Sequence, residues 1–239
     1  DGCKKQGYTT TLANKLFAYI EPFADYGFVR AHAAAYALIA FQTAYLKAHY
    51  PVEFMAGLME TDMGSSDKIT RDMVEANRMS IDILPPDINK SDKDFTIEDN
   101  QKIRFGLGAI KNLGSNSIAE ILKIYKDGNY TSLTNFLERV NIKEVNRKSL
   151  ESLIKTGTLD NLIDRETAWN NIDKLIEFMK IKSQDKERGQ ESLFGGPANQ
   201  HTETEEEIKL EPAENKDKKK KLTWEKELLG IYLSDHPLT

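Results

Sequence analysis

Apolar residues recur at helical spacing along most of the chain and predict a mainly α fold. The longest uninterrupted helix-forming stretch, residues 27–51, reads GFVRAHAAAYALIAFQTAYLKAHYP and runs from a glycine to a proline. Polar residues such as Gln42 and Lys47 interrupt it, which favours a helix buried in a core over a membrane span. Similar stripes predict helices ending at Pro22, running over 52–63, running from a cap at Asp67 to about residue 79, and running over 165–182.

Alternating patterns predict a small amount of β structure near the middle of the chain. Residues 95–98 and 102–105 alternate around the turn pair at 99–100, which is typical of a β-hairpin. Residues 81–84 are expected to form a further short strand, ended by two prolines. From residue 106 to 162 the pattern is again helical, in short pieces separated by glycines.

The pattern changes between residues 183 and 221, where apolar residues become scarce. Seven acidic residues and six lysines crowd residues 201–221, so this segment cannot bury enough apolar surface to offset its chain entropy. We therefore expect a flexible charged tail. An apolar pattern returns at residues 222–238, as at the start of another domain.

Charge and cysteine usage refine this picture. The net charge of −5 gives no sign of nucleic-acid binding, but residues 101–157 hold ten Lys or Arg against five Asp or Glu. Cys3 is the only cysteine, which excludes an internal disulfide and favours a reducing, cytoplasmic compartment. The first residue is not Met and no signal peptide opens the chain, so we expect a piece of a larger protein.

Residues 107–122, LGAIKNLGSNSIAEIL, have the pattern of a helix-hairpin-helix element, a helix followed by a tight glycine turn and a second helix. A glycine lets a DNA phosphate approach the backbone, and the N–H groups at the next helix start can donate to it. Such contacts read only the DNA backbone and carry no sequence preference. The candidate DNA contacts here are Lys111, Asn112, Gly114, Ser115, Asn116 and Ser117. Asn112 stands where the usual hairpin has its first glycine, and Asn tolerates left-handed geometry better than most residues.

A weaker second copy is indicated at residues 145–162, with Gly157 at the turn and Arg147 and Lys148 nearby. For both copies the alternative is a helical hairpin that serves only packing. The basic side chains of both copies could equally form a solvated face.

Two further groups are candidates for binding. Arg30 and His32 lie at a predicted helix start, with Tyr36 one turn after His32, and could form half of an anion site. The alternative for Arg30 and His32 is a cap or a surface feature. The apolar pair Leu193 and Phe194, three and four residues after Gln190, lies in the charged tail and could anchor in a partner's pocket. The pattern contains no metal cluster and no nucleophile and base pair, so no catalytic residue is predicted.

Six blocks, taken in order, resemble the alpha subunit of bacterial DNA polymerase III, the C-family of replicative polymerases. They are FADYGFVRAHAAAYALIAFQTAYLKAHYPVEFMAGLM, ILPPDIN, FGLGAIKNLGSNSI, NRKSLESLIKTGTLD, GQESLFG and LLGIYLSDHPL. The resemblance implies four parts. Residues 1–101 would be the C-terminal part of the fingers and 102–182 a tandem helix-hairpin-helix domain that binds DNA and the clamp. Residues 183–221 would be a flexible linker with a clamp motif, and 222–239 would lead into an OB domain.

The resemblance also implies roles for individual residues. Arg30 and His32, with Tyr36, would contact the incoming deoxynucleoside triphosphate, although family members carry Asn-Lys-Ser-His where this chain has Val29 to His32. Gln190, Leu193 and Phe194 match the anchoring positions of the internal sliding-clamp motif.

The family's activity is magnesium-dependent, template-directed DNA synthesis, with its catalytic aspartates and metal upstream of this stretch, so the chain alone is expected to be inactive. The implied partners are primer-template DNA, the nucleotide, the sliding clamp and other holoenzyme subunits, with no membrane. The alternative is a non-catalytic helix-hairpin-helix module of another repair or replication protein. A preceding palm with three acidic residues would discriminate between the two.

Overall fold

The structure, a computed structural model, describes residues 2–24, 29–187, 208–213 and 217–235. The chain divides into two compact units, Asp1–Tyr50 (unit 1) and Pro51–Thr239 (unit 2), which are described separately. Within the described ranges there are eleven α-helices, one short 3₁₀ helix and one three-stranded sheet, which confirms the predicted mainly α fold. None of the helices in these ranges combines the length and apolar character needed to cross a membrane.

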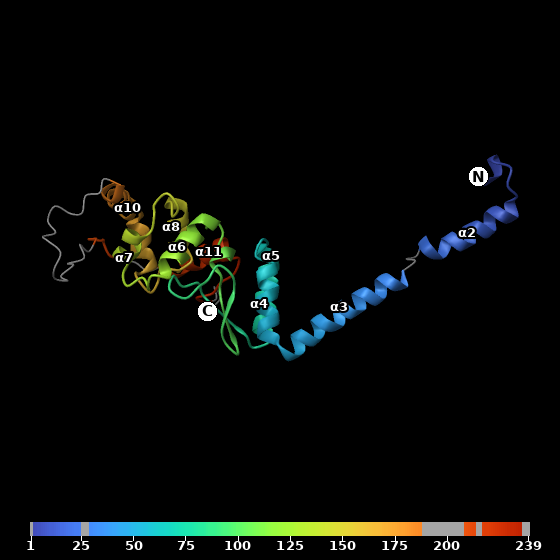
Figure 1. Cartoon of the computed structure of the whole chain (residues 1–239), viewed down its shortest axis with the longest axis horizontal. Coiled ribbons are helices and arrows are strands. Elements are labelled where there is room, and N and C mark those ends of the chain that lie inside the picture. Colours follow the sequence, from blue (N-terminus) through green and yellow to red (C-terminus); the bar gives the residue numbers. More distant parts are fainter. Residues whose placement is uncertain (1, 25–28, 188–207, 214–216, 236–239) are drawn as a thin grey trace. The chain divides into compact units, whose positions relative to one another are not determined.

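Within the described residues of unit 1, the only regular elements are helices (Figure 1). They are α1 (Gly2–Lys5), α2 (Thr10–Ala24) and α3 (Arg30–His49). The prediction that a helix ends at Pro22 is wrong, because α2 continues to Ala24. A proline this close to the end removes one hydrogen bond and is followed by too few residues to break a long helix.

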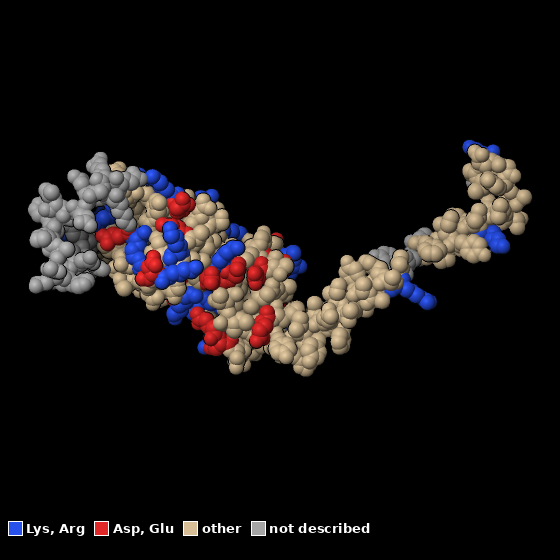
Figure 2. Space-filling view, viewed as in Figure 1, with Lys and Arg blue, Asp and Glu red and all other residues tan. Residues whose placement is uncertain are grey.

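Helix α3 buries none of its described residues, although its sequence predicts a core helix. Figure 2 shows few charged side chains along this unit, in keeping with the two charged residues, Arg30 and Lys47, in α3. An apolar helix needs a second layer to cover it, and the described residues of unit 1 do not supply that layer.

Unit 2 begins with two helices and a small sheet. The elements are α4 (Pro51–Thr61), α5 (Ser66–Arg78), β1 (Asp82–Leu84), β2 (Thr96–Asp99) and β3 (Lys102–Arg104). Pro51 ends one helix and opens the next, since the first position of a helix needs no N–H donor. The predicted hairpin is confirmed by antiparallel pairing of β2 with β3, with Ile97 opposite Ile103. The predicted strand β1 pairs with β3 in parallel, giving the order β1-β3-β2.

The regular elements that follow in the described part of unit 2 are all helices. They are η1 (Leu107–Ala109), α6 (Ser115–Tyr125), α7 (Leu133–Arg139), α8 (Arg147–Lys155), α9 (Arg165–Asn170), α10 (Ile172–Glu187) and α11 (Lys218–Leu229). The prediction of a single helix over 165–182 is wrong, because the helix is interrupted at Asn171, between α9 and α10. The Asn171 side chain donates to Thr167 O at 2.9 Å and exchanges hydrogen bonds with the backbone of Glu211, a partner 40 residues away.

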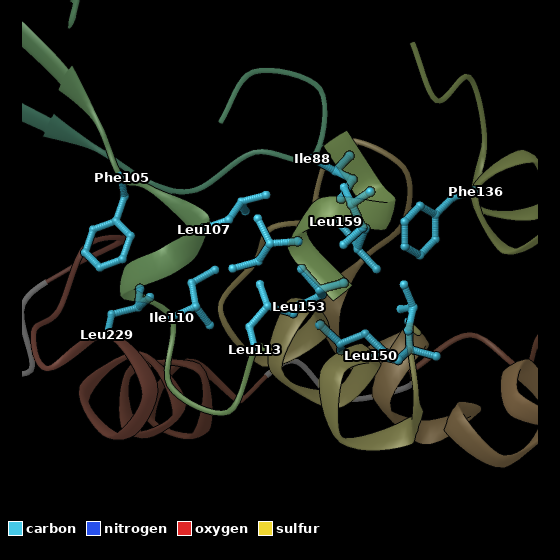
Figure 3. Packing of buried hydrophobic residues seen from close by; sticks show 14 of the residues in the cluster. Ile88, Phe105, Leu107, Ile110, Leu113, Phe136, Leu150, Leu153, Leu159 and Leu229 are labelled. Atoms are coloured by element: carbon cyan, nitrogen blue, oxygen red, sulfur yellow. The ribbon is translucent and has the colours of Figure 1, made fainter. Parts of the chain in front are cut away.

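One hydrophobic core connects the sheet to the helices of unit 2 (Figure 3). It includes Met55 and Ile81 from the first part of the unit, and Leu153 of α8 and Leu229 of α11 from the helical part. The boundary expected after residue 101 therefore lies inside unit 2, whereas the division between the two units falls at Tyr50.

Parts of the expected charged tail and of the expected lead-in segment also pack on unit 2. Ile208 and Leu210 contact the core, and Trp224, Leu228 and Leu229 of α11 are buried. Ile208 and Leu210 thus pack where composition predicted a flexible tail, and the apolar segment from residue 222, expected to open another domain, contributes Leu229 to the core of unit 2.

Candidate nucleic-acid interface

The first predicted hairpin has only the three-residue 3₁₀ helix η1 where a first helix was expected, followed by a turn into α6. Asn112 has a φ of 66°, in the left-handed region that Asn tolerates better than most residues. Gly114 precedes α6 in extended geometry, with φ −73° and ψ 153°, and makes no side-chain cap. The N–H groups that open α6 therefore donate no hydrogen bond to a side chain of the N-cap residue.

The space around Gly114 is open. A Cβ placed on this glycine would meet no atom within 4 Å, and its φ is one that any residue adopts. Folding thus does not require glycine here. An uncovered backbone at a helix start is the environment in which a phosphate oxygen can approach closely.

The start of α8 lies beside the start of α6. Ser117, the third residue of α6, donates to Glu144 O at 2.6 Å, and its Oγ lies 2.8 Å from the Oγ of Ser149, the third residue of α8. Asn146 caps α8 by accepting from Ser149 N at 3.1 Å. Two helix N-termini, each carrying a partial positive charge, are therefore held next to one another.

The predicted basic residues differ in how far they are already paired. Lys111, Arg147 and Lys148 are exposed, and Figure 2 shows Lys and Arg side chains mixed with acidic ones over this helical part. Arg147 bonds Glu151 at 2.9 Å and Asp173 at 2.5 Å, and these carboxylates raise its pKa. Lys111 and Lys148 form no ion pair with any described residue. Their ammonium groups are therefore more available to an anion than the guanidinium of Arg147.

The members of the first-hairpin set divide by burial. Asn112, Gly114, Ser115 and Asn116 are exposed, whereas Ser117 is buried and its hydroxyl is used within the protein. Ser117 therefore positions the two helix starts rather than facing a ligand.

Gly157 of the second hairpin has a different environment. It is buried with a φ of 77°, and a Cβ built there would lie 1.9 Å from Nη2 of Arg165. The flanking Thr156 and Thr158 are also buried and bond each other through their hydroxyls at 2.8 Å. The chain's own guanidinium covers this glycine, so the structure does not bring Gly157 to the exposed surface around Gly114.

Two other basic residues near the hairpins serve the fold. Arg139 donates to Ile124 O at 2.7 Å and Gly128 O at 3.0 Å, satisfying carbonyls at the end of α6. The ammonium of Lys155 lies 4.3 Å from the ring centre of Trp169. A structural role accounts for both residues.

In unit 1 the structure brings two of the three predicted nucleotide contacts together. The rings of His32 and Tyr36 lie 4.4 Å apart, as expected for residues one helical turn apart. Arg30, the first residue of α3, is two positions before His32, and such positions do not share a helix face. Val29 precedes α3 without a side-chain cap.

The remaining predicted groups cannot be placed. Gln190, Leu193 and Phe194 lie outside the described residues. Within the described ranges no group of three or more His, Cys, Asp or Glu side chains is arranged to hold a metal ion.

The prediction from sequence missed Ser149 as the contact that joins the two helix starts. An N-cap Asn three residues before a serine was visible at Asn146 and Ser149 and indicated the helix start. Its proximity to Ser117, 32 residues earlier, could not be read from the pattern.

Comparison with known proteins extends the similarity to the whole chain. The helix-hairpin-helix motif family matches residues 80–168. The DNA polymerase III alpha subunits of Borreliella burgdorferi, Thermus aquaticus and Bacillus subtilis are 40%, 41% and 41% identical to this chain. The alignments cover 99%, 99% and 100% of this chain but only 21%, 19% and 21% of the relatives. The chain thus spans about a fifth of the length of these relatives, and the resemblance stated from its motifs is confirmed.

Proposed function

We propose that this chain, which is similar along its whole length to a segment of the DNA polymerase III alpha subunit, grips duplex DNA for a replicative polymerase. The observation that carries the proposal is the pair of adjacent helix starts, α6 and α8, with an open glycine and exposed lysines beside them. We call the exposed residues Lys111, Asn112, Gly114, Ser115, Asn116, Arg147 and Lys148 the hairpin surface.

Binding at this surface follows from the groups it presents. The uncapped N–H groups at the start of α6 donate to phosphate oxygens, and Gly114 leaves room for the DNA backbone to approach. Lys111 and Lys148 neutralise neighbouring phosphates and release counterions. These groups read the DNA backbone and not the base edges, so the grip is independent of sequence, as a replicase requires.

The test measures binding of the full chain to a fluorescent duplex over a range of salt concentrations. We expect Lys148→Gln to weaken binding about equally on all sequences and to reduce the slope of log affinity against log salt by about 1. The matched control is Lys126→Gln, the same change at an exposed position just past the other end of α6.

The control should bind like the wild type, because α6 spans about 16 Å at 1.5 Å per residue and separates Lys126 from the hairpin surface. Equal losses in both variants would show that the binding reflects overall charge and would refute the hairpin surface. Wild-type binding that does not fall with salt would refute the phosphate grip itself.

For the whole subunit we propose magnesium-dependent, template-directed nucleotidyl transfer in the cytoplasm, together with other replicase subunits. Arg30, His32 and Tyr36 would contact the triphosphate of the incoming nucleotide. The support is the cation at the N-terminus of α3 and the adjacent rings of His32 and Tyr36, which would approach the nucleotide from a different face of the helix than Arg30. The metal and its carboxylates would belong to the palm that the resemblance places upstream. The chain alone is accordingly proposed to be inactive.

We also propose that Gln190, Leu193 and Phe194 tether the polymerase to its sliding clamp. The support is the match of GQESLFG to the family's clamp motif, in a segment too poor in apolar residues to form its own core. Changing both Leu193→Ala and Phe194→Ala should abolish clamp binding in calorimetry. An unchanged affinity would refute this role, and a Lys148→Gln chain that still binds the clamp would show that the two functions are separate.

A further inference from the structure

A buried ion pair connects Glu225 of α11 to Arg165, the first residue of α9, whose side chain covers Gly157 of the second hairpin. The side chains of Arg165 and Glu225 are 5% and 1% exposed, and Nη1 donates to Oε1 at 2.8 Å. Arg165 also grips both oxygens of Asp160, at 3.2 and 2.7 Å, while it covers Gly157. Burying two charges is costly unless their partners are well placed, so this contact fixes α11 against the second hairpin in one geometry.

The other carboxylate oxygen of Glu225 holds the chain that follows α11. Oε2 accepts the N–H groups of Leu233 and Ser234 at 2.9 and 3.0 Å. Burial alone would raise the pKa of Glu225, but these N–H groups and Arg165 outweigh it and hold the pKa below its ordinary value. The Glu225 carboxylate is therefore held in its charged form, and both of its oxygens accept hydrogen bonds within the protein.

The last turn of α11 reaches the first hairpin. Leu228 O accepts the backbone N–H of Lys111 at 3.0 Å, and Leu229 is buried in the same cluster as Ile110 (Figure 3). Gly230 then ends the helix in left-handed geometry, and its carbonyl accepts from Thr70 Oγ1 at 3.1 Å. One helix thus contacts the second hairpin, the turn of the first hairpin and α5.

We propose that α11 is a brace for the proposed DNA grip, and that Glu225 and Arg165 are positioning residues that set the turn of the first hairpin relative to the second. The inference rests on the proposed function. The hairpin surface takes its basic groups from both hairpins, at Lys111 and Lys148. Two phosphate contacts on one duplex act together only while their separation is fixed, so a link that reaches both hairpins sets the affinity.

Neither end of the link touches the proposed ligand. Arg165 and Glu225 are buried and paired within the protein, so their loss removes no phosphate contact. One path from Glu225 to the hairpin surface runs through Leu228 and the backbone N–H of Lys111. Loss of Glu225 should therefore loosen the backbone around Lys111, which amide hydrogen exchange can detect.

The experiment compares two Glu→Gln changes on the same helix in the full chain. Glu225→Gln should weaken binding to a duplex about fivefold or more and speed amide hydrogen exchange over residues 107–117. Glu227→Gln removes the same charge from an exposed site two residues away and should change neither quantity. Exchange over residues 130–137 in both variants reports whether the core of unit 2 stays intact.

A double variant separates positioning from stability. Arg165→Met with Glu225→Gln removes both buried charges, so it should recover thermal stability relative to Glu225→Gln alone while DNA affinity stays low. If affinity returns together with stability, or if Glu225→Gln binds DNA as tightly as Glu227→Gln does, the brace is refuted. If the wild type itself does not bind duplex DNA, the proposed function fails. If the wild type binds and only the Glu225 comparison fails, the grip stands and this inference alone is lost.

Discussion

At the scale of single residues, three turn positions show why glycine and asparagine occur in this chain. Asn112 adopts the left-handed geometry expected of it, and Gly157 does so as well. Gly114 does not, and nothing surrounds it. The same residue type therefore serves folding at Gly157 and leaves open space at Gly114, where the phosphate contact is proposed.

Glu225 gives a prediction on the pH dependence of stability. Its pKa is lowered from 4.5 on folding, so its contribution is fully present above pH 4.5 and is lost as the pH falls through the lower folded value. Glu225→Gln should cost about 3 kcal/mol at pH 7, at the low end for a broken buried pair because Asp160 still pairs with Arg165.

Urea unfolding of the wild type and Glu225→Gln at pH 7 and at pH 3 measures the gap between them. The gap should narrow at the lower pH. A gap of equal size at both values would show that the carboxylate charge is not what stabilises this site.

At the scale of elements, a capping side chain at the N-terminus of α6 should stabilise the fold and weaken DNA binding. Gly114→Ser would place a capping hydroxyl on the N–H groups of α6 and stabilise the fold by about a few tenths of a kcal/mol. The same hydroxyl would occupy the donors proposed for a phosphate, so duplex affinity should fall. Urea unfolding and duplex binding, measured on the same preparation, test the two effects. A variant that is more stable and still binds duplex DNA as tightly as the wild type would show that the start of α6 is not part of the interface.

Gly157 at the turn after α8 gives the contrasting case. Gly157→Ala should lower the free energy of unfolding by more than about 1 kcal/mol, because the new methyl group meets Arg165 and the left-handed geometry is strained. Urea unfolding checks this value. A neutral change would mean that the Arg165 side chain can leave Gly157 at little cost.

At the scale of the whole chain, the contacts of the two hairpins extend beyond residues 102–182 in both directions. Strand β3 loses both neighbours, β1 and β2, if the chain is cut at residue 102, and a cut at residue 182 removes α11. A fragment of residues 51–239 should unfold in one cooperative transition, whereas residues 102–182 should not. Thermal unfolding followed by circular dichroism distinguishes the two, and a cooperative transition in the shorter fragment would contradict this reading of the core.

The sequence by itself determined most of the local structure. Helical spacing predicted most of the helices, although not the interruption at Asn171. Alternation around residues 99–100 predicted the hairpin, and the place of Asn112 in the first hairpin predicted its left-handed geometry. The family resemblance also came from the motifs alone. These features depend on residues close together in the chain, so a pattern can encode them.

The tertiary structure decided which of those elements meet and what each turn is for. Only the packing joins Ser117 to Ser149, ends a helix at Asn171 and places Arg165 over Gly157. Arg165 and Glu225 are 60 residues apart, and their pairing depends on the full core of unit 2. A local pattern fixes the conformation of a segment but not its distant partners, so the difference between an open glycine at 114 and a covered one at 157 arose only on folding.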